Sequence, residues 1–467
     1  MKNMTLQNIT SAVQGVYHGV DSLLAQEVSG ITIDSRKIES DFLFIPIKGV
    51  RVDGHDYIPQ VMQQGALCTL SEHPLPDATF SYIQVASCEQ ALKDLAEFYR
   101  QQLDITVIGI TGSVGKTSTK EMISSVVEQQ FTVLKTAGNY NNEIGVPLTI
   151  FRLTEAHQVA VIEMGINHFG EMTRLAKIAR PDIVVITNIG QCHLEFLIDR
   201  AGVLKAKTEI FQYMNPHGMV ILNGEDDMLR TVTTVHNQSP RFFGLDEPAA
   251  LYTSAIENLG LGGTSCTIHL ENGTTITPTI SIPGQHMILN ALAGAAVGEY
   301  LGIPGQAIQA GIEALVPVSG RSNIIQTDDL TIIDDCYNAN PTSMNASLDV
   351  LRTAITRQVA ILGDMGELGS DEISLHYKVG EYAASCNLDV ICCIGALSVH
   401  MFEGAKQYCL THTDTLKKQP TILHFTDKEQ FIATSSTILS KHDAILVKAS
   451  HFMGFDSIVS TLETMII

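Results

Sequence analysis

Basic residues are scarce in this chain of 467 residues, in which 29 Lys and Arg stand against 50 Asp and Glu and give a formal net charge of −21. A protein that binds nucleic acid regardless of its sequence needs a cationic surface to displace counterions from phosphates. Docking on an anionic membrane needs such a surface as well. The charge therefore argues against both classes of partner. It leaves room for a local phosphate site, because a few backbone N–H groups and one lysine can form one inside an acidic protein.

Cysteine pairs, long apolar runs and a signal-peptide core are also missing. None of the nine cysteines belongs to a C-x-x-C pair, so we expect free thiols in a reducing compartment rather than disulfides or a cysteine-bound metal. No apolar run reaches the ~18 residues that a membrane span needs, and the N-terminal residues lack the apolar core of a signal peptide. We therefore expect a cytoplasmic protein with no membrane insertion. We also expect a monomer, although the sequence leaves the oligomeric state open.

The order of apolar runs and helix-length segments predicts an α/β protein with about three domains. Residues 1–103 read as a small α/β unit. From Asp104 onward, apolar runs such as VAVIEMG alternate with helical segments, which is typical of a parallel sheet covered on both faces. A threonine-rich stretch over 251–283 predicts an antiparallel excursion, and the alternation restarts near Gly320. The predicted domains are 1–103, 104–319 and 320–467.

A glycine-containing turn with the sequence TGSVGKTS lies between a predicted strand and a predicted helix. Its glycines allow backbone N–H groups to turn towards an anion, and the helix N-terminus adds favourable partial charge. Lys116 can neutralise the β- and γ-phosphates of a nucleotide, and the Thr117 hydroxyl can reach Mg²⁺. Ile110 stands where the standard pattern has its first glycine, so this loop is a related variant. It predicts ATP binding by Gly112, Ser113, Val114, Gly115, Lys116, Thr117 and Ser118.

Further segments resemble the ATP-dependent Mur ligases of peptidoglycan synthesis, in the branch that adds D-alanyl-D-alanine to UDP-N-acetylmuramoyl-tripeptide. The resemblance implies a small α/β domain that binds the UDP-sugar, a central ATPase domain with a mostly parallel sheet, and a C-terminal Rossmann-like domain that binds the incoming dipeptide. With the phosphate loop, the matching segments extend over nearly the whole chain. They are GNYNNEIGVPLTI (138–150), VIEMGINHFGEM (161–172), PGQHMILNALAGAA (283–296), IIDDCYNANPTSMNASL (332–348) and ILGDMGELG (361–369).

The resemblance implies an amide ligase that uses ATP to convert a carboxylate into an acyl phosphate, which the amine of D-Ala-D-Ala then attacks. Negative groups meet in this step, so cations must gather there and catalysis is mostly placement and charge stabilisation. Glu163 follows an apolar run at the carboxyl edge of a predicted sheet, where it can bind Mg²⁺. By resemblance, His193 is a second metal ligand, and Lys207 carries a carbamate that coordinates the metal. The implied catalytic residues are Lys116, Lys207 and His193, and the implied nucleotide contacts are Asn290, Arg321 and Asp335.

The resemblance also implies residues that bind the two other substrates. For UDP-N-acetylmuramoyl-tripeptide they are Ser35, Arg36, Lys48, Asp53, Gly54 and His55, with Asn141 and Asn142 as further substrate contacts. For D-Ala-D-Ala they are Asn338, Asn340, Asp364, Glu367, Lys448 and Ser450. Asp and Glu in a loop such as GDMGELG also serve as helix caps.

Two segments depart from the family pattern. After His193 the family usually reads H-L-E-G-F-G-S, whereas this chain has Phe196 and Ile198 in place of the glycines. We therefore expect a different local backbone there. Near the C-terminus the usual K-G-S-R ends in His451, which cannot replace the bidentate fork of an arginine.

Other functions within and beyond this branch stay open. They are a Mur ligase that adds a single amino acid, a folylpolyglutamate synthase, and a catalytically silent Mur-like protein that only binds nucleotide and UDP-sugar. The YNANP and NNEIGVP segments favour the dipeptide ligase, and the intact Lys116, Glu163 and Lys207 favour an active enzyme.

Overall fold

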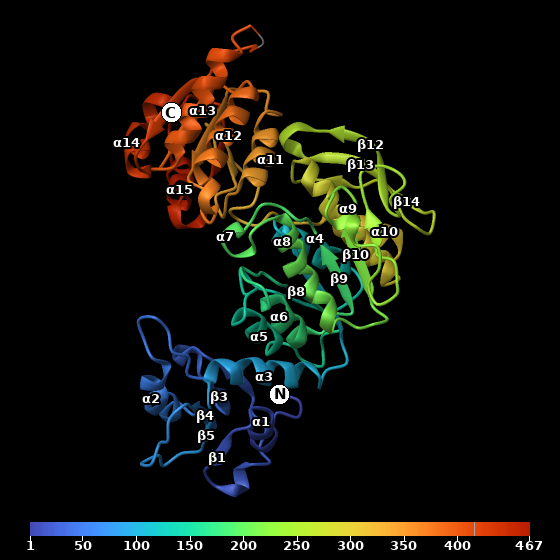
Figure 1. The fold of residues 1–467 in the computed structure, drawn as a ribbon, viewed down its shortest axis with the longest axis vertical. Coiled ribbons are helices and arrows are strands. Elements are labelled where there is room, and N and C mark those ends of the chain that lie inside the picture. Colours follow the sequence, from blue (N-terminus) through green and yellow to red (C-terminus); the bar gives the residue numbers. More distant parts are fainter. Residues whose placement is uncertain (415) are drawn as a thin grey trace.

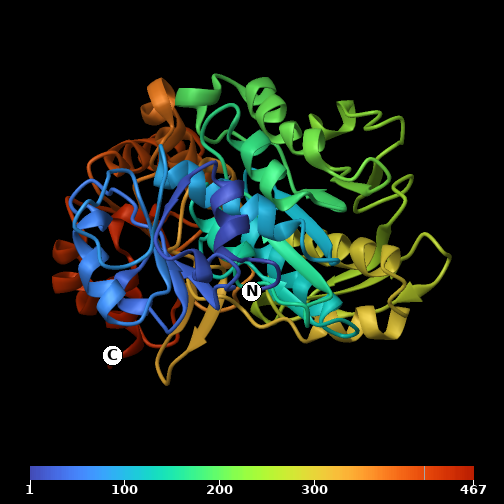
Figure 2. The same cartoon turned by 90° about the horizontal axis from the view of Figure 1, so that it is seen from below.

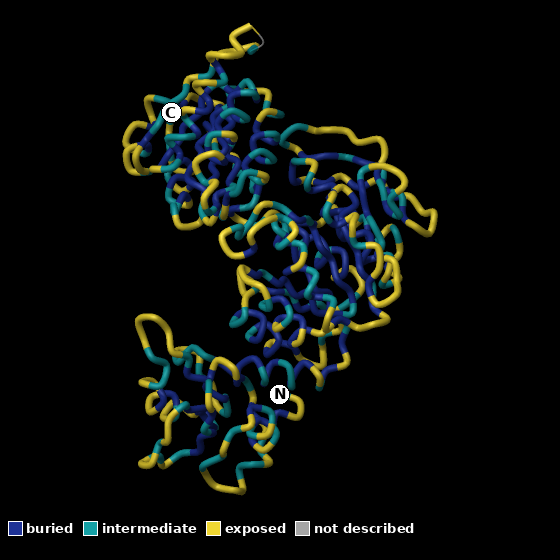
Figure 3. Tube along the Cα trace, in the orientation of Figure 1, coloured by how far each residue is buried: buried dark blue, intermediate teal, exposed yellow. Residues whose placement is uncertain are grey.

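Three α/β units follow one another along the chain and form an arc, in which the first unit lies at the bottom of Figure 1 and the third at the top left. The structure is a computed structural model that describes residues 1–414 and 416–467. Figure 2 shows that the first and third units lie on the same side of the second. In Figure 3, the buried backbone is concentrated inside each unit. The predicted class, a three-domain α/β protein, is confirmed.

The first unit contains a five-stranded sheet in the order β1-β5-β4-β3-β2. All neighbouring strands are parallel except β1, which pairs antiparallel with β5. The strands are β1 (Val16–His18), β2 (Gly30–Thr32), β3 (Phe42–Phe44), β4 (Cys68–Ser71) and β5 (Tyr82–Gln84), and the helices are α1 (Leu6–Ala12), α2 (Ile58–Gln63) and α3 (Cys88–Arg100).

Helix α3 joins the first unit to the second. The Ser87 hydroxyl accepts a hydrogen bond from the N–H of Gln90 and so caps the helix N-terminus. Leu92, Leu95 and Tyr99 of this helix are buried in one apolar core with residues of the second unit. Because the two units share this core, separating them would expose apolar surface to water.

The second unit is built on a six-stranded sheet in the order β11-β10-β9-β6-β8-β7, and every pair in it is parallel. The strands are β6 (Thr106–Thr111), β7 (Val133–Lys135), β8 (Val159–Glu163), β9 (Ile183–Ile186), β10 (Met219–Asn223) and β11 (Arg241–Phe243). The helices are α4 (Lys116–Val127), α5 (Gly145–Ile150), α6 (Glu171–Ala179), α7 (Leu194–Leu197), α8 (Arg200–Thr208), α9 (Gln285–Tyr300) and α10 (Gly305–Glu313).

A separate antiparallel sheet interrupts the second unit, as the stretch over 251–283 predicts. Its strands are β12 (Tyr252–Asn258), β13 (Thr264–His269), β14 (Thr275–Ile276) and β15 (Thr279–Ile280). Its buried side chains pack against α9 and α10 in the same core as one face of the parallel sheet.

The third unit has a six-stranded sheet in the order β16-β17-β21-β18-β19-β20, in which only β16 is antiparallel to its neighbour. Two apolar cores cover its two faces. The strands are β16 (Asn323–Gln326), β17 (Thr331–Asp334), β18 (Gln358–Gly363), β19 (Val390–Ile394), β20 (Thr421–Phe425) and β21 (Ala444–Lys448), and the helices are α11 (Pro341–Leu351), α12 (Glu372–Ser385), α13 (Ser398–Thr411), α14 (Lys428–Ile438) and α15 (Asp456–Glu463). Within residues 1–414 and 416–467, each helix is too short or too polar to cross a membrane.

Candidate active site

A cavity of about 710 Å³ lies between the second and third units, at the carboxyl ends of the parallel strands of the second unit. Open parallel sheets bind ligands at this edge. The cavity brings together most of the residues that the sequence predicts for ATP, metal and dipeptide. They are Ser113, Val114, Gly115, Lys116, Thr117, Ser118, Asn141, Asn142, Glu163, His193, Asn290, Arg321, Asp335, Asn338, Asn340, Glu367 and Lys448.

The phosphate loop connects β6 to α4 and presents its backbone to the cavity. Gly115 precedes the helix with φ 82°, and a Cβ on Gly112 would lie 1.9 Å from Thr187 Oγ1, so a side chain does not fit there. Among the hydrogen bonds of the described residues, none uses the N–H groups of Gly115, Lys116 and Thr117. These groups are free for an anion, as at other helix N-termini. Lys116 Nζ lies over the loop and donates to the Gly112 carbonyl at 2.9 Å.

The Glu163 carboxylate lies at the end of β8 and is 1% exposed. Its Oε1 accepts a hydrogen bond from Asn141 Nδ2 at 2.7 Å, whereas its Oε2 is buried without a hydrogen-bond partner in the described part of the chain. Lys120 Nζ is 4.0 Å from Oε2 and donates to the Thr136 carbonyl at 2.8 Å. A buried carboxylate oxygen with unused lone pairs costs free energy unless a cation or donor satisfies it.

These oxygen atoms suit Mg²⁺ better than a softer metal. Among the described residues, no three His, Cys, Asp or Glu side chains form a cluster that could hold an ion by themselves. Mg²⁺ characteristically takes one or two protein oxygens and completes its shell with water and substrate phosphates. Glu163 Oε2 and the buried Thr117 hydroxyl therefore fit a magnesium nucleotide.

His193 and Lys207 approach this region from the segment after β9. His193 Nδ1 lies 2.8 Å from Glu367 Oε2, so the contact joins the second unit to the third. Burial lowers the pKa of His193, and the Glu367 carboxylate opposes that shift. Lys207 on α8 is 1% exposed and does not line the cavity. Burial lowers its pKa to about 7, and the nearby Lys116 adds to that effect.

The predicted nucleotide contacts come from α9 and from the start of the third unit. Asn290 is buried, and its Oδ1 accepts a hydrogen bond from the Thr119 hydroxyl at 2.7 Å. The Arg321 guanidinium lies 4.1 Å from the centroid of the Tyr337 ring, which holds the arginine at the cavity wall. Asp335 Oδ2 forms an ion pair with Lys448 Nζ at 2.6 Å.

The two asparagines predicted for the dipeptide are partly engaged by the protein. Asn340 caps α11, where its Oδ1 accepts from the N–H of Ser343 and Pro341 occupies the first turn. Asn338 accepts a hydrogen bond from the N–H of Ala339 at its side chain and from Lys448 Nζ at its carbonyl.

Asp364 and Ser450, also predicted for the dipeptide, do not line the cavity. The Asp364 carboxylate accepts hydrogen bonds from the N–H groups of Leu397 and Ser398 at the start of α13. The Ser450 hydroxyl accepts from the N–H of Gly366 at 2.9 Å. Both groups hold loops of the third unit in place, and their contact with the dipeptide stays a prediction.

The residues predicted for the UDP-sugar lie in the first unit, in the segments that follow the neighbouring strands β2 and β3, and outside this cavity. Ser35 and Arg36 form a single 3₁₀ turn with Lys37, and the Arg36 guanidinium binds the Asp34 carboxylate. Asp53 caps a second such turn that contains Gly54 and His55, and the backbones of Lys48 and Asp53 form an isolated antiparallel β-bridge.

Several cavity or neighbouring residues were not singled out from the sequence. Lys120 follows Lys116 by one helical turn on α4. Lysine is rarely buried without a partner, so a second lysine on the buried face of this helix is the sequence signal that indicates a role for Lys120. Asp226 follows β10, and its carboxylate accepts from the N–H of Ile189 at 2.7 Å. His286, Tyr337 and Ser347 line the cavity without any motif of their own.

The segment after His193 keeps a backbone that glycine would favour, although glycine is absent. Ile198 has φ 74° and ψ −62°, and the N–H of Asp199 donates to the Leu197 carbonyl across it at 2.9 Å. This is the rare γ-turn conformation, and it is unfavourable for a β-branched residue. The substitution of Ile198 for the family's glycine therefore places a β-branched residue in a strained turn, and the expected difference from the family's backbone stays a prediction.

Ile198→Gly is expected to raise the free energy of unfolding by about 1 kcal/mol, because relief of the left-handed strain exceeds the entropy that glycine adds to the unfolded chain. The side chain is 77% exposed, so little packing is lost. The shift of the thermal unfolding midpoint measures the effect. Phe196→Gly, placed inside α7, is the matched control and should destabilise. A lower midpoint for Ile198→Gly would contradict the strain argument.

Comparison with known proteins gives matches over the whole chain. Residues 27–100 match the Mur ligase family catalytic domain, residues 110–298 the Mur ligase middle domain, and residues 320–451 the Mur ligase glutamate ligase domain. The chain is 35% identical to the UDP-N-acetylmuramoyl-tripeptide–D-alanyl-D-alanine ligase of Bacillus subtilis (strain 168), and the match covers 99% of each chain.

Solved structures give the same result. MurF from Acinetobacter baumannii is 31% identical, with a TM-score of 0.89 over 99% of each chain. The MurF ligase from Thermotoga maritima, solved in complex with ADP, is 27% identical, with a TM-score of 0.82 over 93% of this chain and 97% of that one. The chain therefore belongs to the Mur ligase family, in the branch of the UDP-N-acetylmuramoyl-tripeptide–D-alanyl-D-alanine ligases.

Proposed function

We propose that this protein is an ATP-dependent ligase that joins D-alanyl-D-alanine to UDP-N-acetylmuramoyl-tripeptide, with release of ADP and phosphate. The observation that carries the proposal is the cavity itself, because it combines the phosphate loop and Glu163 of the second unit with Arg321, Asn338 and other residues of the third. Such a product, a UDP-linked pentapeptide, is a precursor of peptidoglycan.

The reaction begins with transfer of the γ-phosphoryl group of ATP to the terminal carboxylate of the tripeptide. An oxygen of that carboxylate attacks phosphorus, the bond to ADP breaks, and an acyl phosphate forms. The backbone N–H groups at the start of α4 and the Lys116 ammonium stabilise the phosphate charge in this step. When bound, Mg²⁺ would supply further positive charge to the phosphate oxygens, and Glu163 and Thr117 would hold it.

The second step is attack of the D-Ala-D-Ala amine on the acyl carbon, which releases phosphate and one proton. The third unit faces the phosphate loop across the cavity, so its residues orient the dipeptide. The Lys448 ammonium and the arginine of the Arg321–Tyr337 pair are the cations of that wall. The dipeptide contacts of Asn338, Asn340 and Glu367 belong to this proposal.

Lys207 is part of the proposal as a carbamate, the product of its neutral amine and CO₂. The amine is buried and forms no hydrogen bond or ion pair with any described residue. A buried, unpaired ammonium is unfavourable. An anionic carbamate would instead coordinate the metal ion together with His193. The first unit would bind the UDP-sugar through Arg36, Lys48 and their neighbouring turns.

One assay tests the function against the alternatives. Purified protein is mixed with ATP, Mg²⁺, UDP-N-acetylmuramoyl-tripeptide and D-Ala-D-Ala, and phosphate release and product mass are measured. We expect a product heavier than UDP-N-acetylmuramoyl-tripeptide by the mass of D-Ala-D-Ala less one water, with one phosphate released for each product molecule. Product with a single amino acid in place of the dipeptide would favour the related ligases. Bound ATP without any product would favour a silent binding protein.

A further inference from the structure

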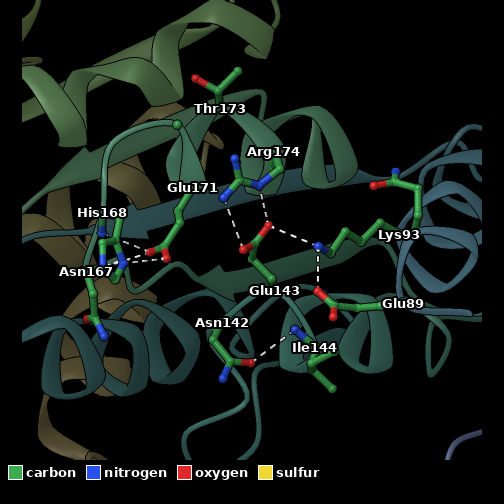
Figure 4. A network of polar contacts seen from close by, with 12 residues as sticks. Glu89, Lys93, Asn142, Glu143, Ile144, Asn167, His168, Glu171, Thr173 and Arg174 are labelled. Carbon is green, nitrogen blue, oxygen red and sulfur yellow. Dashed lines mark hydrogen bonds and ion pairs between the residues drawn. The ribbon is translucent and has the colours of Figure 1, made fainter. Parts of the chain in front are cut away.

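A charged residue of the first unit is buried at its contact with the second. Lys93 on α3 is 9% exposed, and its Nζ lies 3.0 Å from Glu89 Oε1 on the same helix and 3.2 Å from Glu143 Oε1 in the second unit. Figure 4 shows the ammonium between the two carboxylates. A buried ammonium needs such partners, because burial without them carries a large desolvation cost. The position of Lys93 therefore depends on Glu143.

Glu143 is bound on its other side by α6 of the second unit. The Arg174 guanidinium forms two parallel hydrogen bonds with the Glu143 carboxylate, through Nε and through Nη2 (Figure 4). Burial acts to raise the pKa of Glu143, but the bonds from Arg174 and the charge of Lys93 lower it below its usual range. The carboxylate therefore remains ionised and joins α3, α6 and its own loop.

The loop that carries Glu143 also supports the proposed metal ligand. Asn141, two residues earlier, donates its side-chain amide to Glu163 Oε1 at 2.7 Å, and its carbonyl accepts from the N–H of Gly165 at 2.8 Å. The Asn142 side chain accepts hydrogen bonds from the N–H groups of Ile144 and Gly145 and so holds this loop against the start of α5. A short path of direct contacts thus leads from the first unit to the catalytic edge of the sheet.

We propose that Lys93 and Glu143 are positioning residues, which set the angle between the first unit and the phosphate-loop edge of the second. This inference rests on the proposed function, in which the UDP end of the substrate is held by the first unit and its carboxylate must reach the γ-phosphate. The shared apolar core keeps the two units together, but apolar contacts are not directional. Hydrogen-bonded ion pairs have a fixed geometry, so they can set the angle between the two units.

The C-terminal part of α3 has separate contacts with the second unit, so the contact of Lys93 can be tested by itself. Glu97 pairs with Lys177 and Arg180, and the buried Arg100 donates to the carbonyl of Ala179. These contacts hold α3 on the second unit when Lys93 is changed. Loss of the Lys93–Glu143 contact is therefore expected to alter the angle between the two units and not to detach the first unit.

The first experiment compares Lys93→Met and Glu143→Gln with Glu89→Gln as the control. Glu89 contacts Lys93 only within α3, and its side chain is 56% exposed. We expect kcat to fall about 10–100-fold in the first two variants, because small misplacements of reacting groups cost this much. The dissociation constants for ATP and for UDP-N-acetylmuramoyl-tripeptide, each measured alone by calorimetry, should stay within about twofold of the wild type. Glu89→Gln should match the wild type in all three quantities.

Either of two results would overturn the inference. One is an unchanged kcat in Lys93→Met and Glu143→Gln. The other is a fall in kcat together with a similar weakening of the binding of both ATP and UDP-N-acetylmuramoyl-tripeptide, which would indicate damage to the fold. If the wild-type protein itself forms no product, the proposed function fails instead.

A second measurement tests the angle between the first and second units in the absence of substrates. Spin labels are attached at Val50→Cys in the first unit and at Gln130→Cys in the second, both of which are exposed. The distance distribution between the labels should be narrow in the otherwise unchanged chain and in Glu89→Gln, and broader in Lys93→Met. Equal widths in all three would overturn the inference.

Discussion

Lys116→Ala is expected to lower the rate of pentapeptide formation by at least about a thousandfold, the range found when a charge that stabilises a phosphoryl-transfer transition state is removed. The ammonium is fixed above the phosphate loop by its bond to the Gly112 carbonyl at 2.9 Å, so it meets the phosphates in a preset position. Product formation is measured by mass spectrometry at saturating ATP and Mg²⁺.

The matched control for this variant is Lys205→Ala, which removes an exposed lysine of α8 and leaves the cavity unchanged. It should retain the wild-type rate. The thermal unfolding midpoint of Lys116→Ala should stay close to that of the wild type, since the side chain is only partly buried. A rate loss of less than about tenfold would show that the backbone N–H groups carry the phosphate charge without the lysine.

The net charge of −21 gives this lysine particular weight. ATP and the UDP-linked peptide are both polyanions, and a protein of the same sign gives them no long-range attraction. Their affinity must come from short-range groups. In the described cavity these are the N–H groups at the start of α4 and the cations Lys116, Arg321 and Lys448.

Local motifs allowed much of the fold and of the cavity to be predicted. The phosphate loop could be predicted because its glycines, its lysine and the strand–helix junction all lie within one short segment of the sequence. The position of Glu163 followed from its place after an apolar run. Alternation of buried runs with helices predicted the parallel sheets, and the threonine-rich stretch predicted the antiparallel sheet.

The remaining features depend on contacts between distant segments. Lys93 and Glu143 are 50 residues apart in sequence, and each alone reads as a solvated surface charge. The engagement of Asp364 with α13 requires the neighbouring strand to be placed first. Ile198 keeps a backbone that its residue type disfavours, because the surrounding chain determines it. Sequence patterns do not report such tertiary effects.

Lys207→Ala is the second change with a large expected effect, and it should reduce product formation by at least about a hundredfold. Lys207 is 1% exposed, lies outside the walls of the cavity, and has an amine whose pKa burial lowers to about 7. A neutral buried amine can add CO₂, and in the proposed mechanism the carbamate would supply an anionic ligand to the metal. ATP binding should be retained, because the N–H groups of the phosphate loop and Lys116 are unchanged.

Chemical rescue distinguishes a carbamate from a lysine that only fills space. Alanine leaves room for a small carboxylate, so formate or acetate should restore part of the activity of Lys207→Ala, whereas chloride at equal ionic strength should not. Lys116→Ala is the control, since it lacks a cation and no added carboxylate can replace that charge. Lys207→Met removes the amine but keeps most of the side-chain volume, so it should be inactive, resistant to rescue and at least as stable as the wild type, because it replaces an unpaired buried amine with an apolar chain. Failure of every carboxylate to rescue Lys207→Ala, in a protein that still binds ATP, would exclude the carbamate and leave the lysine a structural role.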